Sequence, residues 1–323
     1  MRYAILLFLV TATATAAAAE PPVRVGVIGL DAHALAWAKI LRDRGPDAPY
    51  PELADITIVA AVAAGSPDIP EKQRPLADGI AFYRDAGVEL VDSIAELLPK
   101  VDAVMILSVD GRPHLDQAKP VIAADKPLYI DKPVAATLAE AQAIYALAEE
   151  AGVPIFSSSS LRFAPGTQAL RTDPAVGDVI GCDAHSPCLL EEHHQDLFWY
   201  GIHGVETLFT IMGPGCRQVS RTKTTDTDFV VGLWGDGRIG TFRGHRTGPH
   251  GYGATVFGTK GIAQAGRFEG YEPLLVEIAR FFRTSKPPVS AAETLEIIAF
   301  MEAAERSDAT GGAAVPLAPI ATP

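Results

Sequence analysis

The sequence predicts an α/β protein that begins with a doubly wound parallel sheet and ends with an α+β domain whose open sheet is mainly antiparallel. Between residues 23 and 160, short apolar runs alternate with helical segments, which is typical of parallel strands covered by helices on both faces. From about residue 177, apolar and polar residues alternate between glycine-rich turns, a pattern that favours antiparallel strands. A length of 323 residues is enough for two domains with separate cores.

Six strands are predicted in the first domain, at residues 23–29, 56–64, 88–91, 102–108, 127–131 and 154–160. The helices predicted between them are residues 33–44, 93–98, 113–124 and 137–151. Ser93 and Glu96 have the spacing of a capping box, and Gly152 ends the last of these helices. Right-handed crossovers make this a Rossmann-type domain, in which ligands bind at the carboxyl ends of the strands. The turns after residues 29, 64, 108 and 131 are therefore expected to line one crevice.

In the second half, antiparallel strands are predicted at residues 218–223, 228–234, 238–245 and 253–257. Residues 234–238 (WGDGR) contain the Asp-Gly pair of a tight hairpin turn. Helices are predicted at residues 198–212, 271–284 and 291–306. The chain is thus divided into residues 1–19, 20–160 and 161–323, and the last helix is expected to return to the first domain.

The first nineteen residues are typical of a secretory signal peptide. Arg2 precedes an apolar run at residues 3–10, and an alanine-rich stretch ends in a small-residue cleavage site. The alternative is a single membrane anchor, but the strongly apolar part is shorter than the ~20 residues that a span needs. We therefore expect an exported protein, periplasmic or secreted, with no membrane span after cleavage. Its cysteines, Cys182, Cys188 and Cys216, allow at most one internal disulfide, for which the first two are close enough, or none.

The charge balance excludes one class of partner. Lysine and arginine number 27, against 39 acidic residues, which leaves a formal charge of −12. A nucleic-acid partner is not expected, because binding to phosphates needs a basic face.

The turn after the first strand carries an incomplete dinucleotide-binding signal. Such a turn needs G-x-G-x-x-G, in which the second glycine lets the backbone approach a diphosphate. Residues 29–34 read GLDAHA, so Gly29 alone of the three glycines is present. Asp31 stands at the second position, where its carboxylate would repel a diphosphate. The start of the following helix still offers N–H groups to an anion.

The second strand lacks the acidic residue that binds the ribose of NAD. It ends in Ala63-Ala64-Gly65-Ser66, with Asp68 two residues beyond. Small residues there would tolerate the extra phosphate of NADP, with Arg74 nearby. The alternative is a Rossmann-shaped scaffold that has lost its nucleotide.

A longer pattern surrounds the end of the fifth predicted strand. Asp131-Lys132-Pro133 follows DAVMILSVDGRPH and precedes an alanine-rich helix. This arrangement resembles the glucose–fructose oxidoreductase, inositol dehydrogenase and MocA (Gfo/Idh/MocA) family, which carries Glu-Lys-Pro here. Residues 199–206 (WYGIHGVE) look like the family's Asp-x-Gly-x-His segment, and residues 293–304 look like its last helix. The likeness covers nearly all of the chain after the leader.

The resemblance implies NAD(P)-dependent oxidation or reduction of a sugar, polyol or sugar derivative. It places Lys132 beside the nicotinamide and makes His203 the second proton-handling group. A lysine in a partly desolvated crevice can have a lowered pKa and relay a hydroxyl proton. Together with the strand ends, the resemblance indicates a cofactor-binding set of Gly29, Leu30, Asp31, His33, Ser66, Ser108, Asp110, His114, Asp131 and Lys132.

Two departures from the family pattern indicate a divergent, exported subgroup. Trp199 stands where the family has an aspartate, four residues before His203, and Asp110 stands in a turn that is usually uncharged. The leader has no Arg-Arg pair, which favours export of the unfolded chain. A nucleotide would then be acquired outside the cytoplasm, so we expect one that is tightly held and recycled. Self-association into a homo-oligomer through the open sheet is also expected.

Four residues are candidate substrate ligands. Arg162 could bind an acidic sugar or equally brace the seam between the domains, His194 could bond a sugar hydroxyl, and Trp199 or Tyr200 could stack on a sugar ring. His194, Asp196 and His203 could form a nitrogen–oxygen metal site, but their spacing matches no metal motif, and no metal is expected. Two alternatives to the oxidoreductase stay open, a non-catalytic carbohydrate-binding or scaffold protein and a metal-assisted sugar lyase.

Overall fold

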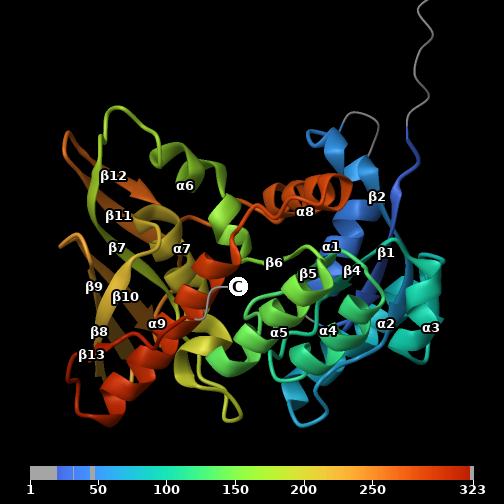
Figure 1. Cartoon of the computed structure of the whole chain (residues 1–323), viewed down its shortest axis with the longest axis horizontal. Coiled ribbons are helices and arrows are strands. Elements are labelled where there is room, and N and C mark those ends of the chain that lie inside the picture. The colour runs from blue at the N-terminus through green and yellow to red at the C-terminus, as the bar shows by residue number, and fades with distance from the viewer. Residues whose placement is uncertain (1–19, 32, 44–47, 321–323) are drawn as a thin grey trace, which may run out of the picture.

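The computed structural model of the chain describes residues 20–31, 33–43 and 48–320. The predicted leader, residues 1–19, lies outside this part. Within it, no helix is long and apolar enough to cross a membrane. Figure 1 shows two domains side by side, each built around one sheet.

The first domain is the predicted parallel sheet with helices on both faces. Its six strands have the order β3-β2-β1-β4-β5-β6, and all neighbours are parallel. The strands are β1 (Val23–Ile28), β2 (Ile56–Val62), β3 (Glu89–Val91), β4 (Ala103–Ile106), β5 (Leu128–Ile130) and β6 (Ile155–Ser157). The helices are α1 (His33–Arg42), α2 (Gln73–Asp85), α3 (Ile94–Leu97), α4 (His114–Ala123) and α5 (Leu138–Ala151). The central strands β4 and β5 are buried along their whole length, as their continuous apolar sequence requires.

Local signals placed several helix ends correctly, and one helix was missed. The hydroxyl of Ser93 accepts the N–H of Glu96 at the start of α3, and Gly152 ends α5 in the left-handed conformation. Helix α2 was not predicted from the sequence. Gly79 and Tyr83 are its only fully buried residues, and its apolar stripe of Leu76, Ile80 and Tyr83, which packs against the core, is narrow.

The second domain is a mixed sheet covered on one face by helices. Its order is β12-β11-β7-β10-β9-β8-β13. The strands are β7 (Val179–Pro187), β8 (Cys216–Lys223), β9 (Thr227–Trp234), β10 (Ile239–His245), β11 (Gly253–Gly258), β12 (Ile262–Ala265) and β13 (Val315–Pro316). The helices that follow the first domain are α6 (Pro165–Leu170), α7 (Ile202–Met212), α8 (Glu272–Thr284) and α9 (Ala291–Ala309). A π-helical turn, Leu197–Gly201, leads into α7.

The predicted, mainly antiparallel sheet contains one parallel pair of strands. The predicted hairpin joins β9 and β10, and these two strands are antiparallel as expected. On its other edge, however, β10 runs parallel to β7. This pairing joins segments more than fifty residues apart and leaves no local signal, because strand direction is set by the path of the intervening chain.

The C-terminal helices tie the two domains together. Helix α8 lies on the first domain in Figure 1, and its Leu275 and Phe281 share a core with Val25 and Phe156 of the parallel sheet. Helix α9 contacts the start of α5, where the N–H of Leu138 donates to Glu302 Oε1 at 2.7 Å. All three cysteines are buried and free, so the disulfide that the sequence allowed is absent.

Candidate functional site

The turn between β1 and α1 holds a carboxyl group at the start of the helix. Gly29 has a φ of 87°, and a Cβ atom there would stand 2.4 Å from the backbone nitrogen of Ser108, so only glycine fits. Two residues later, Asp31 is 1% exposed, and its Oδ1 accepts the N–H of Val109 at 3.1 Å. Its Oδ2 is buried without a hydrogen-bond partner among the described residues. Burial raises the pKa of Asp31 to about 6.

The end of β5 places an acidic and a basic side chain next to each other. Asp131 is fully enclosed, and its Oδ1 accepts the backbone N–H of Lys132 at 2.9 Å. Its Oδ2 lies 2.6 Å from His33 Nδ1, at the start of α1. The peptide bond between Lys132 and Pro133 is cis. Asp131 thereby links the end of β5 to the start of α1, just after β1. The sequence predicted that the cofactor and the reacting hydroxyl lie at these strand ends.

Lys132 is a buried lysine whose amine has no partner. The residue is 4% exposed, and in the described chain its Nζ makes neither a hydrogen bond nor an ion pair within the usual distances. Burial lowers its pKa, and the charge of Lys72 acts in the same direction, while Asp131 and Asp31 partly oppose both. Nζ is not one of the fully buried polar atoms that lack a partner, so it keeps an accessible face and is available to a ligand.

His203 stands on α7, across the seam from these strand ends. Its Nδ1 lies 2.8 Å from the hydroxyl oxygen of Ser159, just after β6. The rings of Tyr200 and Tyr252 flank the imidazole, with centroids 5.2 and 5.9 Å away. Burial, reinforced by the charge of Lys132, holds the pKa of His203 well below its usual range. The imidazole is therefore neutral at pH 7, and it can accept a proton or a hydrogen bond.

Replacing His203 with glutamine is expected to make folding less sensitive to acid. Below about pH 6.5 the unfolded imidazole takes up a proton that the folded one does not. The free energy of unfolding of the wild type therefore falls as the pH drops through 6.5. When the pH is lowered from about 7.5 to 5.5, the free energy of unfolding measured by urea titration should fall by about 1 kcal/mol more for the wild type than for the variant.

The matched control for this prediction is His250→Gln, which changes an exposed histidine of the same domain. It should keep the acid sensitivity of the wild type. Equal losses for the wild type and His203→Gln would show that the folded imidazole titrates normally.

A polar network joins the loops after β2 and β4 to the second domain. Asp110 accepts hydrogen bonds from Ser66 Oγ and Arg112 Nη2, each at 2.6 Å, and its Oδ1 lies 2.9 Å from His194 Nε2. Burial opposes the charge, but these contacts outweigh it and hold the pKa of Asp110 well below its usual range. Arg112 also pairs with Asp68. Three residues that the sequence analysis assigned to cofactor and substrate thus form one bridge between the domains.

Trp199 covers the strand ends from the second domain. It is 7% exposed and packs on Ile69 and Val109. Its ring lies 4.7 Å from that of His194, and Lys72 Nζ lies 5.0 Å from the Trp199 ring centroid. Trp199 therefore contacts residues of the first domain and His194 of its own domain. Stacking of Trp199 on a sugar ring remains a prediction.

A row of aromatic rings, largely missed from the sequence, runs from His203 toward His33. The Tyr252 hydroxyl lies 3.3 Å from that of Tyr200, and the Tyr252 ring lies 6.5 Å from Phe268. Phe268 is 5.0 Å from Tyr271, which in turn lies 5.3 Å from the ring of His33. Apolar faces of this kind suit the C–H faces of a sugar or polyol ring. The sequence offered little to find these two residues, because Phe268 lies in a loop without periodicity and Tyr271 stands at the first position of a predicted helix, where no pattern marks a ligand.

Arg162 braces the seam between the domains through two ion pairs. Its Nε and Nη1 each lie 2.6 Å from a carboxylate oxygen, of Glu206 on α7 and Glu293 on α9. The Ser158 hydroxyl donates to the same Glu206 oxygen at 2.9 Å. The sequence left two roles open for Arg162, and these ion pairs show the role of bracing the seam. Arg162 as a substrate ligand remains a prediction.

The remaining predicted residues shape the strand ends. The ring nitrogens of His114 lie 2.9 Å from the Ser108 carbonyl oxygen and 3.0 Å from that of Pro133, so His114 joins the loops after β4 and β5. The Ser108 hydroxyl donates to Gln117 on α4. Leu30 is fully buried in the core between α1 and the sheet.

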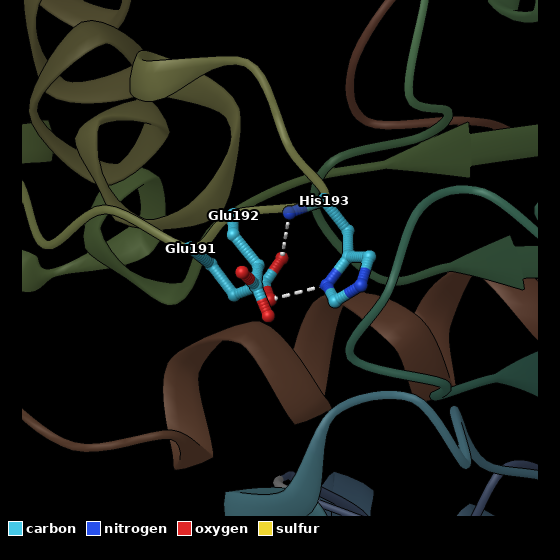
Figure 2. A group of neighbouring side chains, drawn as sticks. All are labelled: Glu191, Glu192 and His193. Carbon is cyan, nitrogen blue, oxygen red and sulfur yellow. Dashed lines mark hydrogen bonds and ion pairs between the residues drawn. The ribbon is translucent and has the colours of Figure 1, made fainter.

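The histidine-rich loop does not assemble the metal site that the sequence raised. His194 bonds Glu191 and Asp110, Asp196 pairs with Arg221 and Lys223, and His203 bonds Ser159, so the three candidates face different partners. Figure 2 shows another group, in which potential ligand atoms of Glu191, Glu192 and His193 lie within 4.8 Å. His193 already bonds Glu191 through both its backbone and its ring. We therefore assign no metal to this loop.

Comparison with known proteins supports the assignment of the first domain. Residues 23–159 match the family model of the Gfo/Idh/MocA oxidoreductases, described as an NAD-binding Rossmann fold. A curated relative, 1,5-anhydro-D-fructose reductase of Ensifer adhaerens, is 31% identical over 126 residues. That alignment spans 38% of this chain and 38% of the relative.

Solved structures share the fold over almost the whole chain. GenD2 from gentamicin A biosynthesis, solved in complex with NAD, has a TM-score of 0.75 at 18% identity and covers 96% of this chain and 100% of its own. The myo-inositol dehydrogenase of Lactobacillus casei, solved with NAD(H) and myo-inositol, has a TM-score of 0.73 at 18% identity. It covers 94% of this chain and 98% of its own. At these identities, the likeness establishes the two-domain fold.

Proposed function

We propose that this chain is an NAD(P)-dependent oxidoreductase of the Gfo/Idh/MocA type that acts on a hydroxyl or carbonyl group of a sugar, polyol or sugar derivative. The observation that carries the proposal is the unpartnered amine of Lys132, buried at a strand end of an NAD-binding Rossmann domain. His203, neutral and also buried, faces the same seam from the second domain. The row of aromatic rings beside His203 suits a ring-shaped, polyhydroxylated substrate.

The residues at the strand ends fit a nicotinamide dinucleotide at most positions. Gly29 makes the tight turn that brings the backbone close, and α1 begins just after it, so that its N–H groups face the turn. Lys132 stands at the end of β5, where the reactive ring of the cofactor would lie. Entry of a dinucleotide requires Trp199 to separate from Ile69 and the side chain of Asp31 to give way.

The chemistry that the cofactor supplies is the transfer of a hydride to or from the substrate carbon. For oxidation of an alcohol, the hydroxyl proton must leave oxygen as the hydride leaves carbon. Lys132 is suited to accept that proton at Nζ, because burial lowers its pKa and so favours the neutral amine. His203 is suited to hold the hydroxyl oxygen or a neighbouring one, with Ser159 at Nδ1 orienting its ring. In the reducing direction, the same amine returns the proton.

The test is a set of turnover assays on the purified protein after removal of the leader. NADH and NADPH are followed at 340 nm with 1,5-anhydro-D-fructose, and NAD and NADP with myo-inositol and other polyols. We expect turnover with at least one pair, together with nicotinamide nucleotide released from the native protein and identified by mass spectrometry. No turnover combined with no bound or binding nicotinamide would favour the alternative of a carbohydrate-binding scaffold.

We also propose that the protein is exported and self-associates. The basic start, apolar run and alanine-rich end of residues 1–19 support export. Exposed Ile180, Leu233, Ile239 and Ile262 lie on strands of the open sheet or its edge and support association. N-terminal sequencing of the protein from the periplasmic or secreted fraction tests the first proposal, and light scattering on the same sample tests the second. A retained leader or a monomer would contradict them respectively.

A further inference from the structure

We propose that the carboxyl group of Asp31 occupies the place of the cofactor diphosphate and sets the affinity of this chain for dinucleotides. On this view the nucleotide binds only when the side chain is displaced or neutralised. The inference rests on the proposed function and adds to it a residue that controls cofactor loading.

The position of the carboxyl group follows from the turn. In a dinucleotide-binding domain the diphosphate lies over the start of the first helix, close to the backbone of the second glycine. Asp31 is that second position in this chain, and α1 begins two residues later. Its Oδ1 reaches across to the N–H of Val109, in the loop that follows the neighbouring strand β4. The carboxyl group therefore fills the gap between the two strand ends that would flank the diphosphate.

The side chain gains little from staying there. Asp31 is 1% exposed, and its Oδ2 has no hydrogen-bond partner within the described residues. A buried polar atom without a partner is unfavourable. A ligand that supplied its own anion to the Val109 N–H and to the start of α1 would replace the one hydrogen bond that Oδ1 makes.

Burial is the main cause of the raised pKa of Asp31, and the charges around it modify the effect. Asp131 at the end of β5 disfavours its negative charge, and Lys72 at the end of the segment before α2 favours it. Lys132 interacts with the same carboxyl, and His33 of α1 pairs with Asp131. With a pKa raised to about 6, Asp31 is charged at pH 8 and neutral at pH 5. Repulsion of a diphosphate is thus strong at the higher pH and absent at the lower.

The experiment measures the dissociation constants of NAD, NADH, NADP and NADPH by calorimetry and, for the reduced forms, nicotinamide fluorescence. The proteins are the wild type, Asp31→Gly, Asp31→Asn and the control Asp116→Asn, which changes an exposed carboxyl on α4. At pH 8 both Asp31 variants should bind at least tenfold more tightly than the wild type, and the control should match the wild type. The wild type should bind the dinucleotides more tightly as the pH falls from 8 to 5. The affinity of Asp31→Asn should not show this increase.

The outcomes separate the inference from the proposed function. Equal affinity and equal pH dependence for the wild type and both Asp31 variants would overturn the inference and leave the oxidoreductase proposal standing. Absence of binding of NAD(H) and NADP(H) by every variant would overturn both. Asp31→Asn preserves the size of the side chain, so it gives a binding result even if Asp31→Gly loosens the turn. Thermal unfolding of each variant shows whether the fold has been weakened.

Discussion

Lys132→Met should lower kcat by about 10³-fold while the protein stays folded. Removal of a positioned general acid or base typically costs 10²- to 10⁴-fold, and Lys132 is the basic group at the centre of the proposed site. Methionine fills a similar volume without a charge. The folded state then no longer has to bury an unpartnered amine, so the free energy of unfolding should be unchanged or higher. Turnover at saturating substrate, together with urea unfolding, measures both effects.

The chain offers a close control for Lys132. Residues 125–127 repeat the tripeptide Asp-Lys-Pro at the other end of β5, away from the seam. Lys126→Met should therefore keep wild-type turnover. Loss of activity in both variants would indicate a general effect of losing a positive charge, and full activity in Lys132→Met would contradict its catalytic role.

The pH dependence of stability gives a second check on Lys132. Its folded-state pKa is lowered by burial, so in the window between that value and the unfolded value of about 10.5 the unfolded chain binds more protons. The free energy of unfolding therefore rises as the pH increases through this window. Lys132→Met should lack this rise when compared with the wild type by urea titration. An identical rise in both proteins would place the amine in solvent.

Arg162→Met should lower the free energy of unfolding by about 3–5 kcal/mol. Breaking a buried ion pair from one side leaves the other charge without compensation. Arg162 and Glu206 are each 4% exposed, and Glu293 of α9 shares the same guanidinium. The pairs join the segment after β6 to α7 and α9, so their loss weakens the seam itself. Urea or thermal unfolding followed by circular dichroism measures the loss.

Two further variants show whether the ion pair explains the result. Arg171→Met changes an exposed arginine of the following segment and should stay within about 0.5 kcal/mol of the wild type. Arg162→Met combined with Glu206→Met removes both buried charges and should recover most of the loss. A small effect of Arg162→Met on stability, together with a large increase in KM, would instead support the substrate-binding role.

The first domain was largely predictable because its signals are local. Most of its strands are apolar runs, and α3 and α5 begin at capping residues that are visible in the sequence. Helix α2 was missed because its apolar stripe of Leu76, Ile80 and Tyr83 is narrow and the rest of its surface is polar. In the second domain, the mainly antiparallel sheet was predicted correctly, but the parallel pairing of β10 with β7 was not foreseen. That pairing depends on where the intervening chain travels, which no short segment encodes.

The candidate site divides in the same way. The residues at the strand ends, including Asp31, Lys132 and Asp131, follow from the order of strands in a parallel sheet, so their nearness could be predicted. The meeting of Arg162 with Glu206 and Glu293 could not, since these residues are 44 and 131 positions apart.

The sequence alone determined the parallel sheet, the position of Lys132 at a strand end and the presence of an acid in the diphosphate turn, because each depends on residue type and short-range order. Only the tertiary structure decided that Arg162 braces the seam, that Trp199 covers the strand ends and that the Lys132 amine has no partner. These features arise from burial and from contacts between distant segments. Burial sets the free energy of each charge, and it exists only once the two domains have packed together.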